Sequence, residues 1–129
     1  MARAENVQTL TGIAGEALPI YRFVHLQADG KLDLVDTDDL RADGITAEAA
    51  AADGDVIAYA PCGQPAIMKV EASEAIAVGG LVAADGGTGK AKVPAAAGAA
   101  QFTLGVALTA AAADGDIIEV MLQVAANQV

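Results

Sequence analysis

Short runs of alternating apolar and polar residues, separated by turn-forming residues, extend along most of the chain. Leu32 and Leu34 flank Asp33, and Ile118 and Val120 share one parity of a later run. Such alternation is typical of strands with one buried face. The tripeptide Ala-Asp-Gly begins at residues 28, 42, 52, 84 and 113. It favours turns, because Asp bonds to nearby backbone and Gly accepts a positive φ. The pattern predicts many short strands joined by tight turns.

The chain also contains an internal duplication. AAADGDVIAY at residues 50–59 recurs as AAADGDIIEV at residues 111–120. Upstream, GEALPIYRFV at residues 15–24 resembles SEAIAVGGLV at residues 73–82. Because the matching segments keep their order, the sequence predicts two related halves that share one plan.

The predicted organisation is a single all-β domain, a small β-barrel or sandwich built from these two halves. An extended N-terminal arm, residues 1–14, precedes the domain of residues 15–129, whose halves are approximately 15–72 and 73–129. An alanine-rich stretch at residues 46–50 favours helix by propensity. It reaches the next Ala-Asp-Gly within about two turns, and helices that short are marginal in water. Only short helical turns are therefore expected.

The last predicted strand is apolar on both faces. Ile118 and Val120 share one face, while Ile117 and Met121 lie on the other, interrupted by Glu119. Two explanations remain open. A neighbouring subunit covers the second face, which makes Ile117 and Met121 subunit-interface residues, or the strand is buried inside a sandwich.

Composition narrows the range of partners. Hydrophobic residues make up 54% of the chain but aromatic residues only 3%, and alanine buries little area, so subunit association would supplement the core. The net charge of −10 repels phosphate backbones and anionic lipid, so we expect no nucleic acid and no membrane as partner. The N-terminus lacks the apolar stretch of a signal peptide, and we expect folding in a cytoplasm.

Candidate catalytic residues are few. The chain has one histidine (His25), one cysteine (Cys62) and one serine (Ser73). Nothing around them resembles a nucleophile motif, so we expect no enzyme. The acidic stretch at residues 36–39 departs from a calcium-binding loop, and residues 86–90 depart from a phosphate-binding loop. No metal and no cofactor are expected.

Several segments together resemble one known family. Residues 103–109, 110–113 and 115–120 resemble the C-terminal signature of the capsid decoration (cement) proteins of tailed phages, formerly a family of unknown function, and residues 15–18 and 89–90 fit it as well. The resemblance implies a structural virion protein that binds the outer capsid surface and stabilises the shell by bridging neighbouring capsid subunits. The implied partners are the major capsid protein and the chain itself, as a homotrimer. The implied location is the virion, and the host cytoplasm during assembly.

The resemblance also suggests a role for the N-terminal arm. Arg3, Asn6, Val7 and Leu10 are candidate capsid-contact residues, because an extended segment can add a strand to a neighbouring sheet. A frayed terminus is the other explanation. Three other functions remain open: a carbohydrate- or small-molecule-binding β module of a phage fibre or tail, a small hydrolase using His25 with an aspartate, and another virion component such as a head-fibre base.

Overall fold

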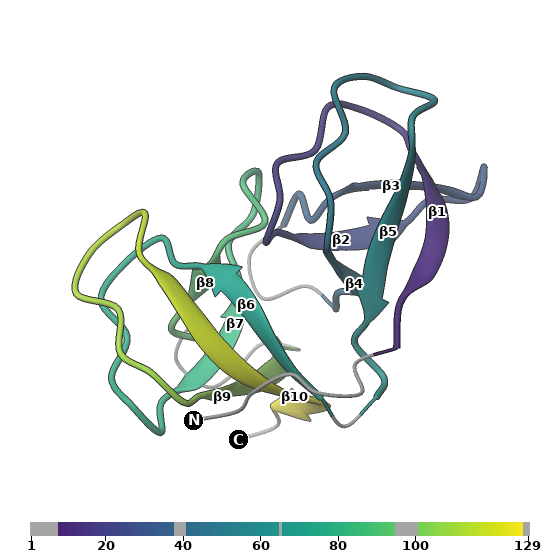
Figure 1. Ribbon diagram of the computed structural model, residues 1–129. Coiled ribbons are helices and arrows are strands. Elements are labelled where there is room, and N and C mark those ends of the chain that lie inside the picture. Colours follow the sequence, from purple (N-terminus) through teal and green to yellow (C-terminus); the bar gives the residue numbers. More distant parts are fainter. Residues whose placement is uncertain (1–7, 38–40, 65, 95–100, 128–129) are drawn as a thin grey trace.

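The structure is a computed structural model that describes residues 8–37, 41–64, 66–94 and 101–127. These residues form strands and turns, with no helix among them (Figure 1). The prediction of a small all-β barrel or sandwich is confirmed. The strands are β1 (Leu10–Ala14), β2 (Phe23–Leu26), β3 (Lys31–Leu34), β4 (Gly44–Thr46), β5 (Val56–Pro61), β6 (Ile67–Glu71), β7 (Leu81–Ala84), β8 (Ala91–Lys92), β9 (Gln101–Ala107) and β10 (Ile117–Asn127).

The strands of the first half close into a barrel, called here the first barrel, with the order β1-β3-β2-β4-β5. β1 closes it by pairing antiparallel with β5, as in Ile13↔Val56, and parallel with β3, as in Ile13↔Lys31. Closure leaves no free sheet edge to which another chain could add a strand. The barrel interior is filled by buried side chains: Ala14, Leu18, Val24, Leu32, Ala50 and Ile57.

The strands of the second half form a sheet, called here the second sheet, with the order β6-β10-β9-β7-β8. β6 corresponds to β1, and β10, β9, β7 and β8 correspond to β5, β4, β2 and β3, so the two halves have the same strand order. They differ in closure. The parallel pairing of β1 with β3 is reduced in the second sheet to a bridge between Ala72 and Ala91. The inner face of the second sheet carries Val70, Val82 and Ile118.

The repeated Ala-Ala-Asp-Gly-Asp segment forms the same turn in each half. The Asp55 carboxylate accepts hydrogen bonds from two preceding alanine amides at 2.8 and 3.2 Å, and Asp116 accepts the equivalent pair at 2.7 and 3.2 Å. Gly54 and Gly115 have φ of 95° and 97°, a region that side chains disfavour. The sequence repeat therefore encodes a repeated backbone conformation.

An outward-facing row of the first barrel packs against the second sheet. Phe23, Ile45 and Ala60 alternate with the barrel's interior residues, and each is 0% exposed. They belong to the same buried cluster as Val70 and Val82 of the second sheet. These three residues, called here the junction row, therefore lie buried in the contact between the two halves. Figure 1 shows the first barrel at upper right and the second sheet at lower left.

Hydrogen bonds and an ion pair hold this junction together. The Phe23 amide donates to the Gly89 carbonyl at 2.6 Å, and the Glu71 amide donates to the Tyr21 carbonyl at 3.0 Å. Between them, the Arg22 guanidinium donates to the Thr88 carbonyl at 2.9 Å and to the Glu71 carboxylate at 3.2 Å. This segment of the first barrel thus bonds both to the end of β6 and to the β7–β8 turn, next to the place where pairing of β6 with β8 is reduced to one bridge.

The expectation of a short helical turn at residues 46–50 was wrong. Thr46 ends β4, and its hydroxyl donates to the Pro19 carbonyl at 2.8 Å. Ala50 exchanges backbone hydrogen bonds of 2.8 and 2.9 Å with Leu18. These cross-chain bonds satisfy backbone groups that an isolated helical turn would leave to water, so tertiary pairing overrides the alanine propensity.

Part of the predicted N-terminal arm belongs to the first barrel. Residues 10–14 form β1, because β3 and β5 would otherwise leave unpaired edges. Just before it, the Gln8 amide donates to the Gln64 side chain at 3.0 Å, and the Gln64 side chain donates back to the Gln8 carbonyl at 2.7 Å. The remaining domain limits stay a prediction.

Candidate functional site

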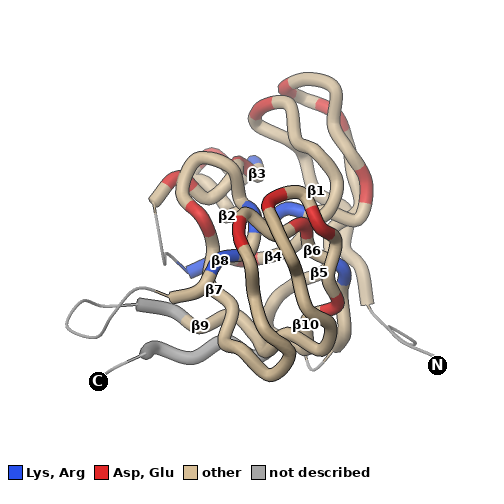
Figure 2. The backbone as a smooth tube through the Cα atoms, turned by 90° about the vertical axis from the view of Figure 1, so that its left-hand side faces the viewer, with Lys and Arg blue, Asp and Glu red and all other residues tan. Residues whose placement is uncertain are grey.

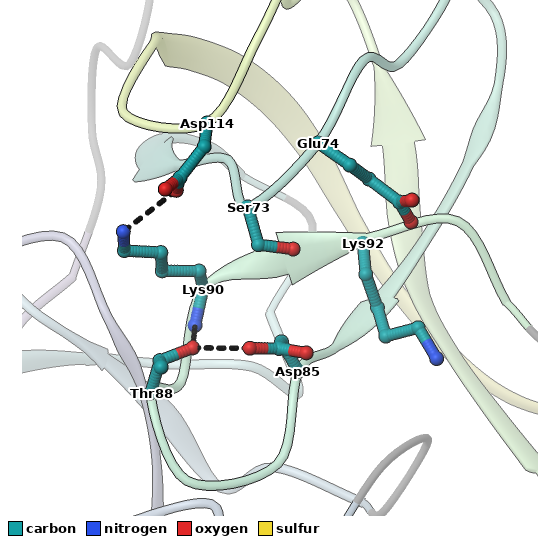
Figure 3. A pocket seen from close by; sticks show the side chains of 7 residues that line it. All are labelled: Ser73, Glu74, Asp85, Thr88, Lys90, Lys92 and Asp114. Carbon is teal, nitrogen blue, oxygen red and sulfur yellow. Dashed lines mark hydrogen bonds and ion pairs between the residues drawn. The ribbon is translucent and has the colours of Figure 1, made fainter.

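An open polar pocket of about 350 Å³ lies beside the incomplete closure of the second sheet. Its side chains come from the end of β6, the β7–β8 hairpin and the turn before β10 (Figure 3). Pockets for small molecules are mostly apolar with a few convergent polar groups, whereas none of these lining residues is a large apolar or aromatic one. They are Ser73, Glu74, Asp85, Thr88, Lys90, Lys92 and Asp114.

The pocket follows from two differences between the halves. Gly15 occupies in the first barrel the position of Ser73, and Asp33 occupies the position of Lys92. A Cβ atom on Gly15 would collide with the Asp33 carboxylate, so that carboxylate takes up the space above the glycine. In the second sheet a serine fits there, and the Lys92 side chain extends away from it (Figure 3).

Two carboxylates hold the lysine at the pocket's edge. The Nζ atom of Lys90 lies 2.7 Å from Asp114 and 3.1 Å from Glu71. The hydrogen bonds to Asp114 and then to Glu71 raise the pKa of Lys90, and the bond to Lys90 lowers the pKa of Asp114. Lys31 and Asp53 form the equivalent pair in the first barrel, at 2.9 Å. The Lys90–Asp114 pair thus recurs with the repeat, which indicates that it stabilises this turn in both halves.

Other polar groups of the pocket also bond to the protein. The Thr88 hydroxyl donates to the Asp85 carboxylate at 2.5 Å, and the Ser73 hydroxyl donates to the Ala91 carbonyl at 3.1 Å. Glu74 accepts a hydrogen bond from the backbone amide after β8 at 2.8 Å. These contacts stabilise the hairpin and do not single out a reacting group.

The three candidate catalytic residues lie on separate elements. His25 is on β2 opposite Asp33, and its Nε2 atom lies 3.0 Å from the Gln27 side-chain nitrogen. Cys62 is buried after β5, and burial raises the pKa of its thiol to about 12, which keeps it protonated and unreactive at neutral pH. Ser73 follows β6, on the other half. The structure therefore does not bring His25 together with Cys62 or Ser73, and a hydrolase that uses His25 with an aspartate stays an untested alternative.

Within the described ranges, no group of three or more His, Cys, Asp or Glu side chains could hold a metal ion. The acidic stretch at residues 36–39 lies partly outside them. The described part of the chain contains no helix that is long and apolar enough to cross a membrane. The acidic residues lie mainly in the loops between strands (Figure 2), so the negative charge is carried by the turns.

Of the four predicted capsid-contact residues, the structure describes only Leu10. Arg3, Asn6 and Val7 lie outside the described residues. Leu10 begins β1, opposite Tyr59 of β5, and is half exposed. A role for these residues in binding a capsid stays a prediction.

The predicted subunit-interface residues lie on the exposed outer face of the second sheet. Ile117 and Met121 are 46% and 41% exposed. Met121 lies opposite both Ile67 of β6 and Val106 of β9, and Val106 lies opposite Leu81 of β7. Ile67 and Val106 are partly exposed, and Leu81 is 45% exposed. These four residues, the outer row, form an apolar line across four strands, which the sequence could not reveal because the strand order brings distant segments together.

The fold is shared with a phage protein of known structure. No family model matches the chain, and no curated protein matches it. Among solved structures, the chain is similar to the head fiber gp8.5 N base of bacteriophage phi29, with a TM-score of 0.67 and 20% identity. The similarity covers 90% of this chain and 93% of that chain. At this identity it establishes the fold.

Proposed function

We propose that this chain is a structural protein of a phage virion that binds the outer capsid surface and stabilises the shell by bridging neighbouring capsid subunits. Its partners in this proposal are the major capsid protein and other copies of itself, and its location is the outside of the virion after synthesis in the host cytoplasm. The observation that carries the proposal is the fold shared with a head-fibre base over nearly all of both chains.

The distribution of exposed apolar side chains supports a function through surfaces. On the first barrel, Ile13 and Val56 lie opposite one another and both are exposed. On the second sheet, Ile117 and Met121 are exposed on the outer face. Contiguous exposed apolar patches rimmed by polar residues mark interaction sites. On a capsid the same modest contact would be made at many identical positions, so its effect on the shell would accumulate.

Co-sedimentation with expanded, empty capsids of the phage that encodes this chain tests the proposal. We expect saturable binding at a fixed ratio to the major capsid protein, and a higher temperature of capsid disruption at saturation. As the matched control, the temperature of capsid disruption is measured on the same capsids after the bound chain has been removed by proteolysis. If the chain stays in the supernatant at saturating concentration, the proposed capsid binding is wrong.

The structural similarity favours a second candidate of the same class, the base that attaches a fibre to the head. A fibre base binds the capsid but need not connect neighbouring subunits. A fibre base that contacts one capsid subunit at a time would saturate the capsid without raising the temperature at which the shell breaks. Measuring both quantities on one preparation separates the two functions.

A further inference from the structure

The junction row is a docking surface for a β unit of the chain's own fold. Phe23 lies opposite Ile45, and Ile45 lies opposite Ala60, so the row crosses β2, β4 and β5 in register. All three side chains are fully buried. They are buried together with side chains of the second sheet, which has the same strand order as the first barrel.

The outer row occupies the equivalent positions of the second sheet. Leu81 of β7 lies opposite Val106 of β9, which lies opposite Met121 of β10. These strands correspond to β2, β4 and β5, and the register of the row is the same. The residues are again apolar, yet Leu81 and Met121 remain 45% and 41% exposed. A row that docks a β unit in one half thus has an exposed equivalent in the other.

Part of the surface that covers the junction row also has an uncovered equivalent, although Val70 and Val82 correspond to Gly12 and Val24, which face the filled interior of the first barrel. In the second sheet it includes Glu71 at the end of β6 and Gly89 in the β7–β8 turn, where a Cβ atom would lie 2.5 Å from the Phe23 carbonyl. The equivalent residues of the first barrel are Ile13 and Gly30. Ile13 is 45% exposed, and a Cβ atom on Gly30 would meet nothing within 4 Å.

The charged groups of the internal junction are replaced by neutral residues at the two uncovered surfaces. Within the chain, Arg22 pairs with Glu71 across the junction. The position of Arg22 is taken in the second sheet by Gly80, and the position of Glu71 is taken in the first barrel by Ile13. A buried charge without its partner is strongly destabilising. Contact between these two surfaces avoids that cost, because neither surface carries a charge at the positions of Arg22 and Glu71.

We propose that the outer row of one copy docks on the first barrel of a second copy, around Ile13 and Gly30, and so repeats between chains the contact that the junction row makes within one chain. The two contacting surfaces differ, so the association is head-to-tail, and it closes into a ring if the rotation between copies allows it. The proposal concerns the free protein and does not depend on capsid binding.

Sedimentation equilibrium of three variants tests the proposal. Met121→Asp places a charge in the outer row, and Ile13→Asp places one on the receiving surface. Val93→Asp is the matched control, because Val93 is 47% exposed and lies after β8, outside both surfaces. We expect the unmodified chain and the control to form the same assembly. Each of the two other variants should sediment as a single chain, with a dissociation constant raised at least about tenfold, equivalent to about 1.4 kcal/mol.

A mixture of the two defective variants makes the test specific to head-to-tail contact. Met121→Asp keeps an intact receiving surface and Ile13→Asp keeps an intact outer row, so an equimolar mixture should form a species of two chains. Assembly lost in Met121→Asp but kept in Ile13→Asp would mean that the outer row pairs with itself, and would overturn the proposal. A single-chain mass for the unmodified protein at its highest soluble concentration would overturn it as well.

Thermal unfolding of each variant shows whether it is folded. If an aspartate variant is unfolded, Met121→Thr and Ile13→Thr replace it, because threonine is tolerated in strands and still removes apolar contact. If self-association fails, capsid binding can still be observed by co-sedimentation, and the reverse also holds. The two failures are therefore distinguishable.

Discussion

The carboxylate of Glu71 lies 3.2 Å from the guanidinium of Arg22, across the junction of the first barrel and the second sheet. The two side chains are only 21% and 14% exposed. The same carboxylate lies 3.1 Å from Nζ of Lys90, and the guanidinium also donates to the Thr88 carbonyl. One acidic side chain thus joins the first barrel to the β7–β8 hairpin.

Glu71→Gln should lower the free energy of unfolding by about 2 kcal/mol, because it leaves the largely buried Arg22 cation without its counter-charge while the side-chain volume is kept. Urea unfolding at neutral pH measures the change. Asp53→Asn removes one partner of the exposed ion pair with Lys31 and is the control, which should have little effect. Equal losses in both variants would contradict a special role of the junction pair.

Gly89→Ala should destabilise the protein more than Gly30→Ala, although both glycines occupy the same place in the repeat. Their φ angles are 69° and 86°, and a left-handed backbone costs about 1–2 kcal/mol for any residue with a Cβ atom. At Gly89 the added atom would also lie 2.5 Å from the Phe23 carbonyl, whereas at Gly30 it would meet nothing within 4 Å. Urea unfolding of both variants isolates the collision. Equal losses would mean that the Phe23 carbonyl moves away at no cost.

The all-β class could be predicted from sequence because alternation and turn residues act locally. Leu32 and Leu34 are on a strand, and the two glycines at 54 and 115 form the expected turns. The closure of the barrel could not be predicted, because pairing of β1 with both β3 and β5 depends on long-range register. Residues 10–14 carry too little alternation to identify a strand, so the sequence predicts them as part of the arm.

The candidate surface could be predicted only in part, for the same reason. The parity of one strand is enough to predict Met121 as a surface residue. Leu81 and Val106 belong to the same row, but they become its neighbours only through the order β10-β9-β7. Likewise, the pocket beside Lys90 could not be predicted from sequence, because it depends on how closely β6 approaches β8. Side-chain parity is local information, whereas a surface that crosses strands is not.

Phe23→Ala and Leu81→Ala should differ greatly although the two residues are equivalent in the repeat. Phe23 is 0% exposed in the junction row, and removal of a buried phenyl ring costs about 3–5 kcal/mol. Leu81 is 45% exposed, so its truncation in dilute solution should cost less than about 1 kcal/mol. Urea unfolding at low protein concentration measures both. A large loss for Leu81→Ala in a protein shown to be monomeric would mean that the outer row is covered within the chain.

Cys62 should make the stability of the protein fall at alkaline pH. Burial raises the pKa of its thiol from 9.0 to about 12 in the folded chain. The folded state therefore keeps a proton that the unfolded state releases, so the stabilisation is complete below pH 9.0 and is lost as the pH rises toward about 12.

The variant Cys62→Ala isolates this effect from the lysines and tyrosines that titrate in the same range. Its free energy of unfolding should be lower at neutral pH, because a buried side chain has been shortened, but it should fall less steeply above pH 9.0 than that of the unmodified chain. Urea unfolding at a series of pH values gives the difference between the two proteins directly. Parallel curves would contradict the raised pKa, and so would rapid labelling of the native thiol by an aromatic disulfide at about pH 8, where a protonated and buried thiol reacts only through opening of the fold.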